Sequence, residues 1–238
     1  MRSITGKRII LIPARIASGR FPGKALAEVM PGVPLVRAVY DRAKSTNADH
    51  VIVVTPDREI ANYCRENGLP WRPSREDHPT GTHRCAEVLR HFKEEVNVKV
   101  VVNWQVDEPL VPMVWVNRLM EGEPTIATLA SRGGDAAGGL MDDSKVVKVA
   151  FTPTSRRCHW FSRAPMRGAF FHCGVYAFYP AILEELGQLR PTLYSIRESL
   201  EQLGWIESGH SIYGLLMDDL PPSVNTPEDL EHVKEAMR

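Results

Sequence analysis

The stretch at residues 8–24 reads RIILIPARIASGRFPGK. Its first six residues form a compact apolar run that is typical of a buried strand, and the rest is a long loop rich in basic residues. Two similar runs follow, HVIVVT at 50–55 and KVVVNW at 99–104. Segments with helical spacing lie between the runs, at 35–45, 57–67 and 82–95. Strands that alternate with helices predict βαβ units and a parallel sheet.

The second half of the chain is less regular. Its patterns predict strands at 146–150, 170–179 and 211–217, a helix at 195–203, and a last helix that starts at 225–228 and runs to the C-terminus. The glycine-rich stretch GGDAAGG at 133–139 predicts a flexible loop. The fold class is therefore α/β: a mostly parallel, Rossmann-like sheet flanked by helices, with a small elaboration in the second half.

Composition narrows the range of partners. The 238 residues include 29 Lys and Arg and 29 Asp and Glu, so the formal net charge is zero. Without a global positive field, neither nucleic acid nor an anionic membrane is an expected partner. The apolar run near the N-terminus is too short for a signal-peptide core or a membrane span. The cysteines show neither Cys-x-x-Cys nor zinc-ligand spacing, which favours reduced thiols in a cytoplasmic protein.

The loop that follows the first predicted strand can bind phosphates. It carries Arg15, Arg20 and Lys24, with Gly19 and Gly23 between them. Fixed positive charge and backbone N–H groups that converge at glycines are what a triphosphate requires. The order GxxxxGK[ST] is absent, so this is not a Walker loop. The alternative is a solvated basic loop without a ligand.

Two further motifs should meet this loop, because loops that follow parallel strands open at the same edge of a sheet. Gln105-Val106-Asp107-Glu108-Pro109 ends the run KVVVNW, and a carboxylate there can hold Mg²⁺ together with substrate phosphates. Thr80-Gly81-Thr82 precedes a predicted helix and can bind a base or a phosphate. The alternatives are an ordinary strand-ending turn and, for Thr82, a plain helix cap.

In their order along the chain, these motifs resemble the 3-deoxy-manno-octulosonate (Kdo) cytidylyltransferases. The family patterns PARxxSxRxPGKxL, DHxSGTxR, QGDEP, VKV, FSRxPIP, LEQL and VDTPEDLE are similar to the segments at 13–26, 77–84, 105–109, 147–149, 161–165, 200–203 and 224–231. The resemblance implies a sheet of the nucleotide-diphospho-sugar-transferase type in one domain, 1–238. Its nucleotide-binding half would be 1–132, and its acceptor-binding and dimerisation half would be 133–238.

The resemblance also implies an activity and its residues. The enzyme would transfer CMP from CTP to a small anionic acceptor, release pyrophosphate, require Mg²⁺ and form a homodimer. Catalytic residues would be Arg15, Lys24 and Asp107, and the metal would be held by Asp107 and Asn225. The nucleotide would contact Pro13, Ala14, Arg15, Arg20, Lys24, Arg75, Thr80, Gly81, Thr82 and Gln105. The acceptor would contact Gln105, Arg163, His172, Tyr176, Glu198, Glu201 and Gln202.

The acceptor side departs from the family pattern. The Arg-His pair of RHxGIYxY becomes Phe-His or His-Cys within FHCGVYAF at 171–178, and the segment after Arg163 is shorter. Val106 replaces the glycine of QGDEP. Asn225 replaces the aspartate of VDTPEDLE and is a neutral, weaker metal ligand, although it could also simply cap the last helix. The bulk of Val106 and the shortened segment after Arg163 favour a small polyanionic acceptor.

A phosphonate such as phosphonoformate, used in antibiotic biosynthesis, is the acceptor that these departures favour. The alternative is Kdo or a related sugar acid, used in lipopolysaccharide or cell-surface polysaccharide synthesis. A nucleotide-sugar glycosyltransferase is disfavoured because the basic loop suits a triphosphate better than a diphosphate sugar. A non-catalytic nucleotide-binding module is disfavoured by the joint presence of Arg15, Lys24 and Asp107. No GxGxxG follows the first strand, which argues against a dehydrogenase.

Overall fold

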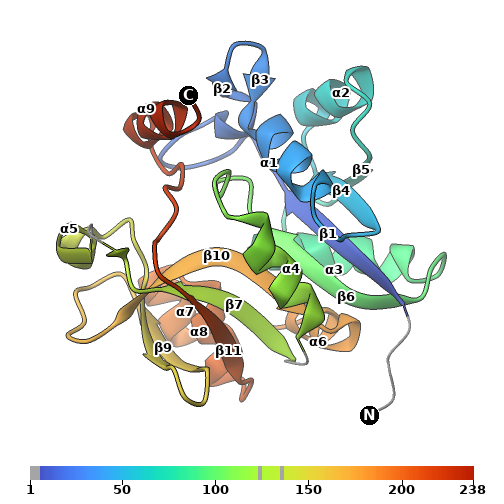
Figure 1. Cartoon of the computed structure of the whole chain (residues 1–238). Coiled ribbons are helices and arrows are strands. Elements are labelled where there is room, and N and C mark those ends of the chain that lie inside the picture. The colour runs from blue at the N-terminus through green and yellow to red at the C-terminus, as the bar shows by residue number, and fades with distance from the viewer. Residues whose placement is uncertain (1–5, 123–124, 135–136) are drawn as a thin grey trace.

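A computed structural model describes residues 6–122, 125–134 and 137–238. Its centre is a nine-stranded sheet in the order β5-β4-β1-β6-β10-β7-β11-β9-β8 (Figure 1). A separate two-stranded hairpin pairs β2 (Glu28–Met30) with β3 (Val33–Pro34). The strands of the large sheet are β1 Lys7–Pro13, β4 His50–Thr55, β5 Trp71–Pro73, β6 Val98–Trp104, β7 Ile126–Ser131, β8 Lys148–Thr152, β9 Arg157–Ser162, β10 Phe170–Phe178 and β11 Ile212–Met217.

Most strands of the sheet point the same way. β5, β4, β1 and β6 pair in parallel, and so do β7 and β11. β10 runs antiparallel to both β6 and β7, so β7 keeps the direction of β6. The prediction of a mostly parallel α/β sheet is therefore confirmed. As a consequence, the carboxyl ends of β1, β6, β7 and β11 and the amino end of β10 share one edge.

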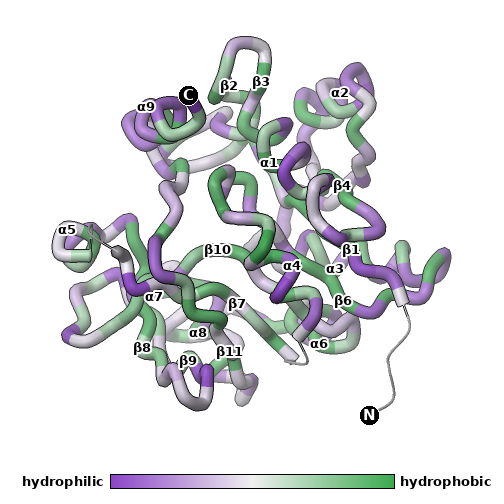
Figure 2. Tube along the Cα trace, in the orientation of Figure 1, coloured by the Kyte–Doolittle hydropathy of each residue, from purple (hydrophilic) through white to green (hydrophobic). Residues whose placement is uncertain are grey.

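Helices cover both faces of the sheet. The helices are α1 Leu35–Lys44, α2 Arg58–Glu66, α3 Gly81–Phe92, α4 Met113–Glu121, α5 Ala137–Asp142, α6 Pro180–Leu186, α7 Leu193–Glu198, α8 Glu201–Glu207 and α9 Pro227–Ala236, with a short 3₁₀ turn, η1, at Lys24–Leu26. Helices α1, α2, α4 and α9 contribute to one apolar cluster, and α3, α6 and α8 contribute to the other. Figure 2 shows hydrophobic colour along β7 and β10 and hydrophilic colour over much of α9.

The first strand shows why a continuous apolar run was needed. Ile10 and Ile12 are fully buried in one apolar cluster, whereas Ile9 and Leu11 are buried in the other. Successive side chains of a strand point to opposite faces, so a strand covered on both sides must be apolar at every position. Burial of each such side chain contributes about 1.5–3 kcal/mol to folding.

Two predicted elements are corrected by the structure. The helix predicted at 195–203 is two helices, α7 and α8, because Ser199 ends α7 in the left-handed conformation with φ of 53°. The loop predicted at 133–139 is partly helical, since residues 137–139 belong to α5 and residues 135–136 lie outside the described ranges. A single left-handed residue is enough to break a helix and redirect the chain.

Two predictions from composition can be compared with the structure. Cys64, Cys85, Cys158 and Cys173 are buried free thiols, as the sequence indicated. Among the described residues, every helix is too short or too polar to cross a membrane.

Candidate active site

A cleft of about 660 Å³ opens at the shared edge of the sheet. Its walls combine segments that lie far apart in sequence: the basic loop after β1, the turn after β6, the start of α3, the loop before β8, the start of β10, the α7–α8 junction and the connection from β11 to α9. In Figure 1 this last connection joins β11, at the bottom of the view, to α9 at the top, beside the β2–β3 hairpin. Both halves of the chain therefore build one cleft.

An ion pair between Lys24 and Asp107 lies at the centre of the lining. Lys24 Nζ is 2.7 Å from Asp107 Oδ2 and donates a second bond of 3.2 Å to the carbonyl of Val224. The Val224 N–H in turn donates to the main-chain carbonyl of Asp107. Gly23, with φ of 76°, turns the basic loop so that Lys24 can reach the end of β6. The contact joins three segments of the cleft at one point.

Arg20 crosses the cleft to Asn225. Its Nη2 donates to Asn225 Oδ1 at 2.7 Å, and Asn225 Nδ2 donates to Ser223 Oγ. The suggestion that Asn225 caps the last helix is wrong. Thr226 is the N-cap of α9, and its side chain accepts a bond from the N–H of Asp229, whose carboxylate accepts the N–H groups of Asn225 and Thr226. The Asn225 side chain thus makes its contacts in the cleft lining and does not cap the helix.

Arg15 lines the cleft near a cation that the sequence prediction missed. Arg84, on α3, also lines the cleft and is only 3% exposed. Burial lowers the pKa of Arg84, and the nearby charge of Arg15 lowers it further. Its Nη2 makes a 3.4 Å bond to the carbonyl of Glu76. The signal was present, because Arg84 fills the last position of the segment at 77–84 that resembles DHxSGTxR.

The start of α3 lies against Pro13, where the basic loop begins. Thr80 is its N-cap and accepts a bond from the N–H of His83, so Thr82 is not the cap. A Cβ added at Gly81 would lie 3.1 Å from Pro13 Cγ, a tight contact that requires a small shift of the proline. Pro13, Ala14, Thr80 and Gly81 all line the cleft, as predicted for the nucleotide site.

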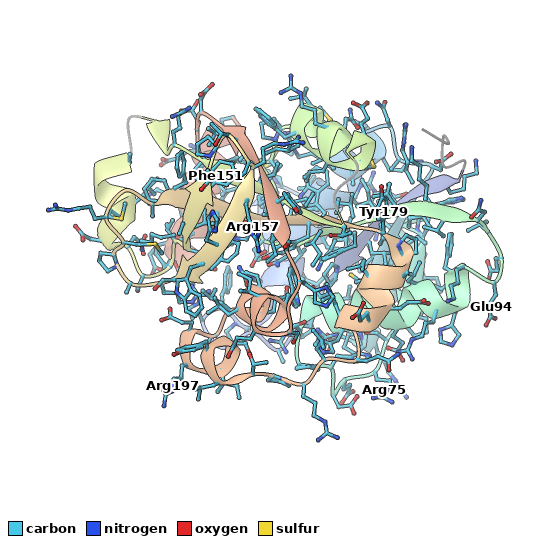
Figure 3. The ribbon with its side chains drawn as sticks, turned by 90° about the horizontal axis from the view of Figure 1, so that it is seen from below. Arg75, Glu94, Phe151, Arg157, Tyr179 and Arg197 are labelled. Carbon is cyan, nitrogen blue, oxygen red and sulfur yellow. The ribbon has the colours of Figure 1, made fainter. Side chains whose placement is uncertain are left out.

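Two residues predicted to bind the nucleotide lie elsewhere. Thr82 is fully buried and accepts a 3.2 Å bond from Asn103 Nδ2, so it lies behind the wall. Arg75 is not among the lining residues, its side chain is 68% exposed, and it pairs with Asp77 at 3.2 Å. Figure 3 shows Arg75 at the periphery of the molecule.

The predicted acceptor residues line the same cleft, with one exception. Gln105, Arg163, His172, Tyr176, Glu201 and Gln202 are lining residues. Glu198 is not: its Oε2 accepts bonds from Ser162 Oγ and from the N–H of Arg163, and so holds the backbone of that arginine.

Burial shifts the pKa of two of these residues. Burial lowers the pKa of His172 to about 3, so the ring is neutral, and its Nε2 lies 2.9 Å from Thr128 Oγ1. Burial raises the pKa of Glu201, although the hydroxyls of Thr80 and Thr82 bond to it. Glu201 therefore links α8 to the start of α3.

Glu108 is a buried acid that the sequence prediction did not assign. Its Oε1 accepts the N–H of Gly174 at 3.0 Å, and Cys173 Sγ lies 3.7 Å from Oε2. Burial, reinforced by the charge of Asp107, raises the pKa of Glu108 to about 8. Glu108 is thus protonated at neutral pH, and it joins the end of β6 to β10.

The donor set fits a magnesium ion that is shared with a substrate. Within residues 6–122, 125–134 and 137–238, no three His, Cys, Asp or Glu side chains gather as a metal cage. Mg²⁺ commonly needs only one or two carboxylates when substrate phosphates and water supply the other ligands. Asp107 lines the cleft and can serve in this way. Asn225 Oδ1 would first have to release Arg20.

Comparison with known proteins gives the family. The cytidylyltransferase family model matches residues 9–131. A 3-deoxy-manno-octulosonate cytidylyltransferase of Polynucleobacter necessarius is 37% identical over 246 residues, covering 96% of this chain and 95% of the relative. The chain belongs to the cytidylyltransferase family. A relative of the same name from Halorhodospira halophila is also 37% identical, with 96% of each chain covered.

Solved structures agree with this assignment. The structure of CMP:2-keto-3-deoxy-manno-octonic acid synthetase complexed with CTP matches with a TM-score of 0.84 and 31% identity, covering 97% of this chain and 98% of that one. The inositol-1-phosphate CTP transferase of T. maritima, at 16% identity and a TM-score of 0.69, shares the fold.

Proposed function

We propose that this cytidylyltransferase transfers CMP from CTP to Kdo or a closely related sugar acid and releases pyrophosphate. The observation that carries the proposal is similarity over nearly the full chain to relatives named for that acceptor. The geometry supports it, because Arg163, His172 and Gln202 line the same cleft as Arg15 and Lys24. Two substrates can thus meet in one site.

The reaction is an in-line displacement. A hydroxyl oxygen of the sugar acid forms a bond to the α-phosphorus of CTP, the bond from that phosphorus to the bridging oxygen breaks, and pyrophosphate leaves. The hydroxyl proton passes to solvent. Positioning and charge neutralisation are the protein's main contributions to such transfers. Arg15, Arg20 and Lys24 would neutralise the phosphates, and Arg163 would bind the carboxylate of the acceptor.

Asp107 is the residue that would hold Mg²⁺ in this scheme, together with the triphosphate. The ion supplies charge neutralisation on the phosphate oxygens when it is bound. Lys24, which lies 2.7 Å from Asp107 Oδ2, would then shift toward the phosphates of CTP.

The phosphonate acceptor favoured by the sequence is less well supported than Kdo. Val106 is only 5% exposed and packs within an apolar cluster, so the core absorbs much of its bulk. Asn225 binds Arg20 across the cleft, a role that does not depend on a polyanionic acceptor. Family membership also favours cytidylyl transfer over glycosyl transfer and over a binding module without catalysis.

The test is identification of the product. The enzyme is incubated with CTP, Mg²⁺ and Kdo, and the mixture is analysed by mass spectrometry for CMP-Kdo. The proposal expects CMP-Kdo in the presence of all three components. A parallel incubation with phosphonoformate provides the comparison, and formation of a CMP-phosphonate without any CMP-Kdo would overturn the proposal.

A further inference from the structure

Lys148 is a fully buried cation beside Arg163, a residue of the cleft lining. It is the first residue of β8 and has no exposed surface. Its Nζ donates three bonds to main-chain carbonyls: those of Asp143 at 2.6 Å, Val146 at 3.0 Å and Arg163 at 3.1 Å. The three acceptors satisfy the three N–H donors of an ammonium group. Lys148 thus ties the loop before β8 to the backbone of Arg163.

Arg163 binds the same loop from the other side. Its Nη1 donates to the carbonyls of Ser144 at 3.2 Å and Lys145 at 3.3 Å. The four successive carbonyls of residues 143–146 are therefore each bound by one of two cations. Together these bonds hold the loop and Arg163 as one unit.

Burying an ammonium group in a protein interior is energetically unfavourable. Removing it from water carries a desolvation penalty, and an apolar side chain of similar volume is often equally stable or more stable. Burial accordingly lowers the pKa of Lys148. The buried cation is explained if it is needed to hold these main-chain carbonyls in one fixed arrangement. That arrangement sets where Lys145, Val146 and Arg163 line the cleft.

We propose that Lys148 is a positioning residue for the acceptor: it fixes the loop at 143–146 and the backbone of Arg163, so that the Arg163 guanidinium is presented to the acceptor's carboxylate. The inference rests on the proposed function, because it places the acceptor at the Arg163 end of the cleft. Lys148 itself has no exposed surface with which to contact a substrate. Its effect should therefore reach the acceptor and leave CTP binding unchanged.

The test separates the two substrates kinetically. Lys148→Met should raise the KM for the acceptor by about tenfold or more, as expected when a binding group is misplaced. The KM for CTP should stay within about twofold of the wild-type value, the usual limit for independent sites. Lys234→Met, which removes an exposed lysine on α9, is the matched control and should change neither constant. Calorimetric titration with CTP verifies that each variant is folded.

A double-mutant cycle tests whether Lys148 acts through Arg163. In an Arg163→Met background, Lys148→Met should raise the acceptor KM by less than about twofold. The inference would be overturned if the increases in acceptor KM caused by Lys148→Met and Arg163→Met multiply fully in the double variant. Equal changes in the KM for CTP and the KM for the acceptor would also overturn it. If Lys148→Met does not bind CTP, Lys148→Gln, which keeps an amide donor, is measured in the same cycle and must show the same split.

Failure of the proposed function gives a different result. In that case the wild-type enzyme shows no turnover with Kdo, whatever happens at Lys148. The double-mutant cycle at Lys148 and Arg163 is then run with whichever acceptor, phosphonoformate or another sugar acid, does turn over. The same selective rise in the KM for that acceptor is required.

Discussion

Lys24→Met is the substitution that tests the cleft most sharply, because it keeps the length of the stem and removes only the charged end. The ammonium lies 2.7 Å from Asp107 Oδ2 and 3.2 Å from the carbonyl of Val224, and the side chain is 13% exposed. A hydrogen bond to a charged group is worth about 1.5–3 kcal/mol. If Lys24 gives that much to the phosphates in the transition state, kcat/KM should fall by about 10–150-fold.

The assay is pyrophosphate release at saturating Mg²⁺ with CTP varied, and Lys234→Met again serves as the control on the outer side of α9. Removal of Lys24 also leaves Asp107 without its partner, so the free energy of unfolding in urea should fall by about 1 kcal/mol. A variant that loses this stability yet keeps kcat/KM within about twofold of the wild-type value would refute the assignment, because Lys24 would then be structural only.

Three further outcomes are expected. Asp107→Asn should lose metal-dependent turnover while keeping its melting temperature within a few degrees of the wild-type value. Chelation should abolish wild-type activity. An Asp107→Asn variant that responds to Mg²⁺ like the wild type would place the metal elsewhere. Asn225→Asp should lower the Mg²⁺ concentration for half-maximal rate, because it adds a carboxylate beside Arg20, and an unchanged Mg²⁺ titration would show that position 225 is remote from the ion. The pKa of Glu108 is raised from 4.5 to about 8 in the folded state, so the folded protein holds a proton that the unfolded chain releases, and stability should fall as pH rises from about 4.5 to 8. Glu108→Gln should flatten that slope in urea unfolding between pH 5 and pH 9, and an equally steep slope in the variant would exclude Glu108 as its source.

The sequence could predict those parts of the fold in which a strand is buried on both faces of the sheet. β1 is buried on both faces, so its continuous apolar run admits few other interpretations. The break between α7 and α8 could not be predicted in this way. It depends on Ser199, a non-glycine residue in the left-handed region, and serine gives no signal for that conformation.

Which charged loops of the cleft lie together could be predicted from the sequence. Lys24 and Asp107 meet because their loops leave the same edge of the sheet. The orientation of side chains on a helix could not be predicted from the spacing of motifs alone. Thr82 is buried because α3 starts at Gly81 and the helix turns Thr82 toward Asn103. Lys145 lines the cleft through a backbone arrangement set by Lys148 and Arg163, which no local motif indicates.

The most direct measurement of the central claim is the rate of pyrophosphate release from CTP across a panel of acceptors that includes Kdo, other sugar acids and phosphonoformate. Release should depend on the acceptor, and Kdo or a close sugar-acid relative should have the highest kcat/KM. A higher kcat/KM for phosphonoformate than for every sugar acid, or release that is the same without an acceptor, would contradict it.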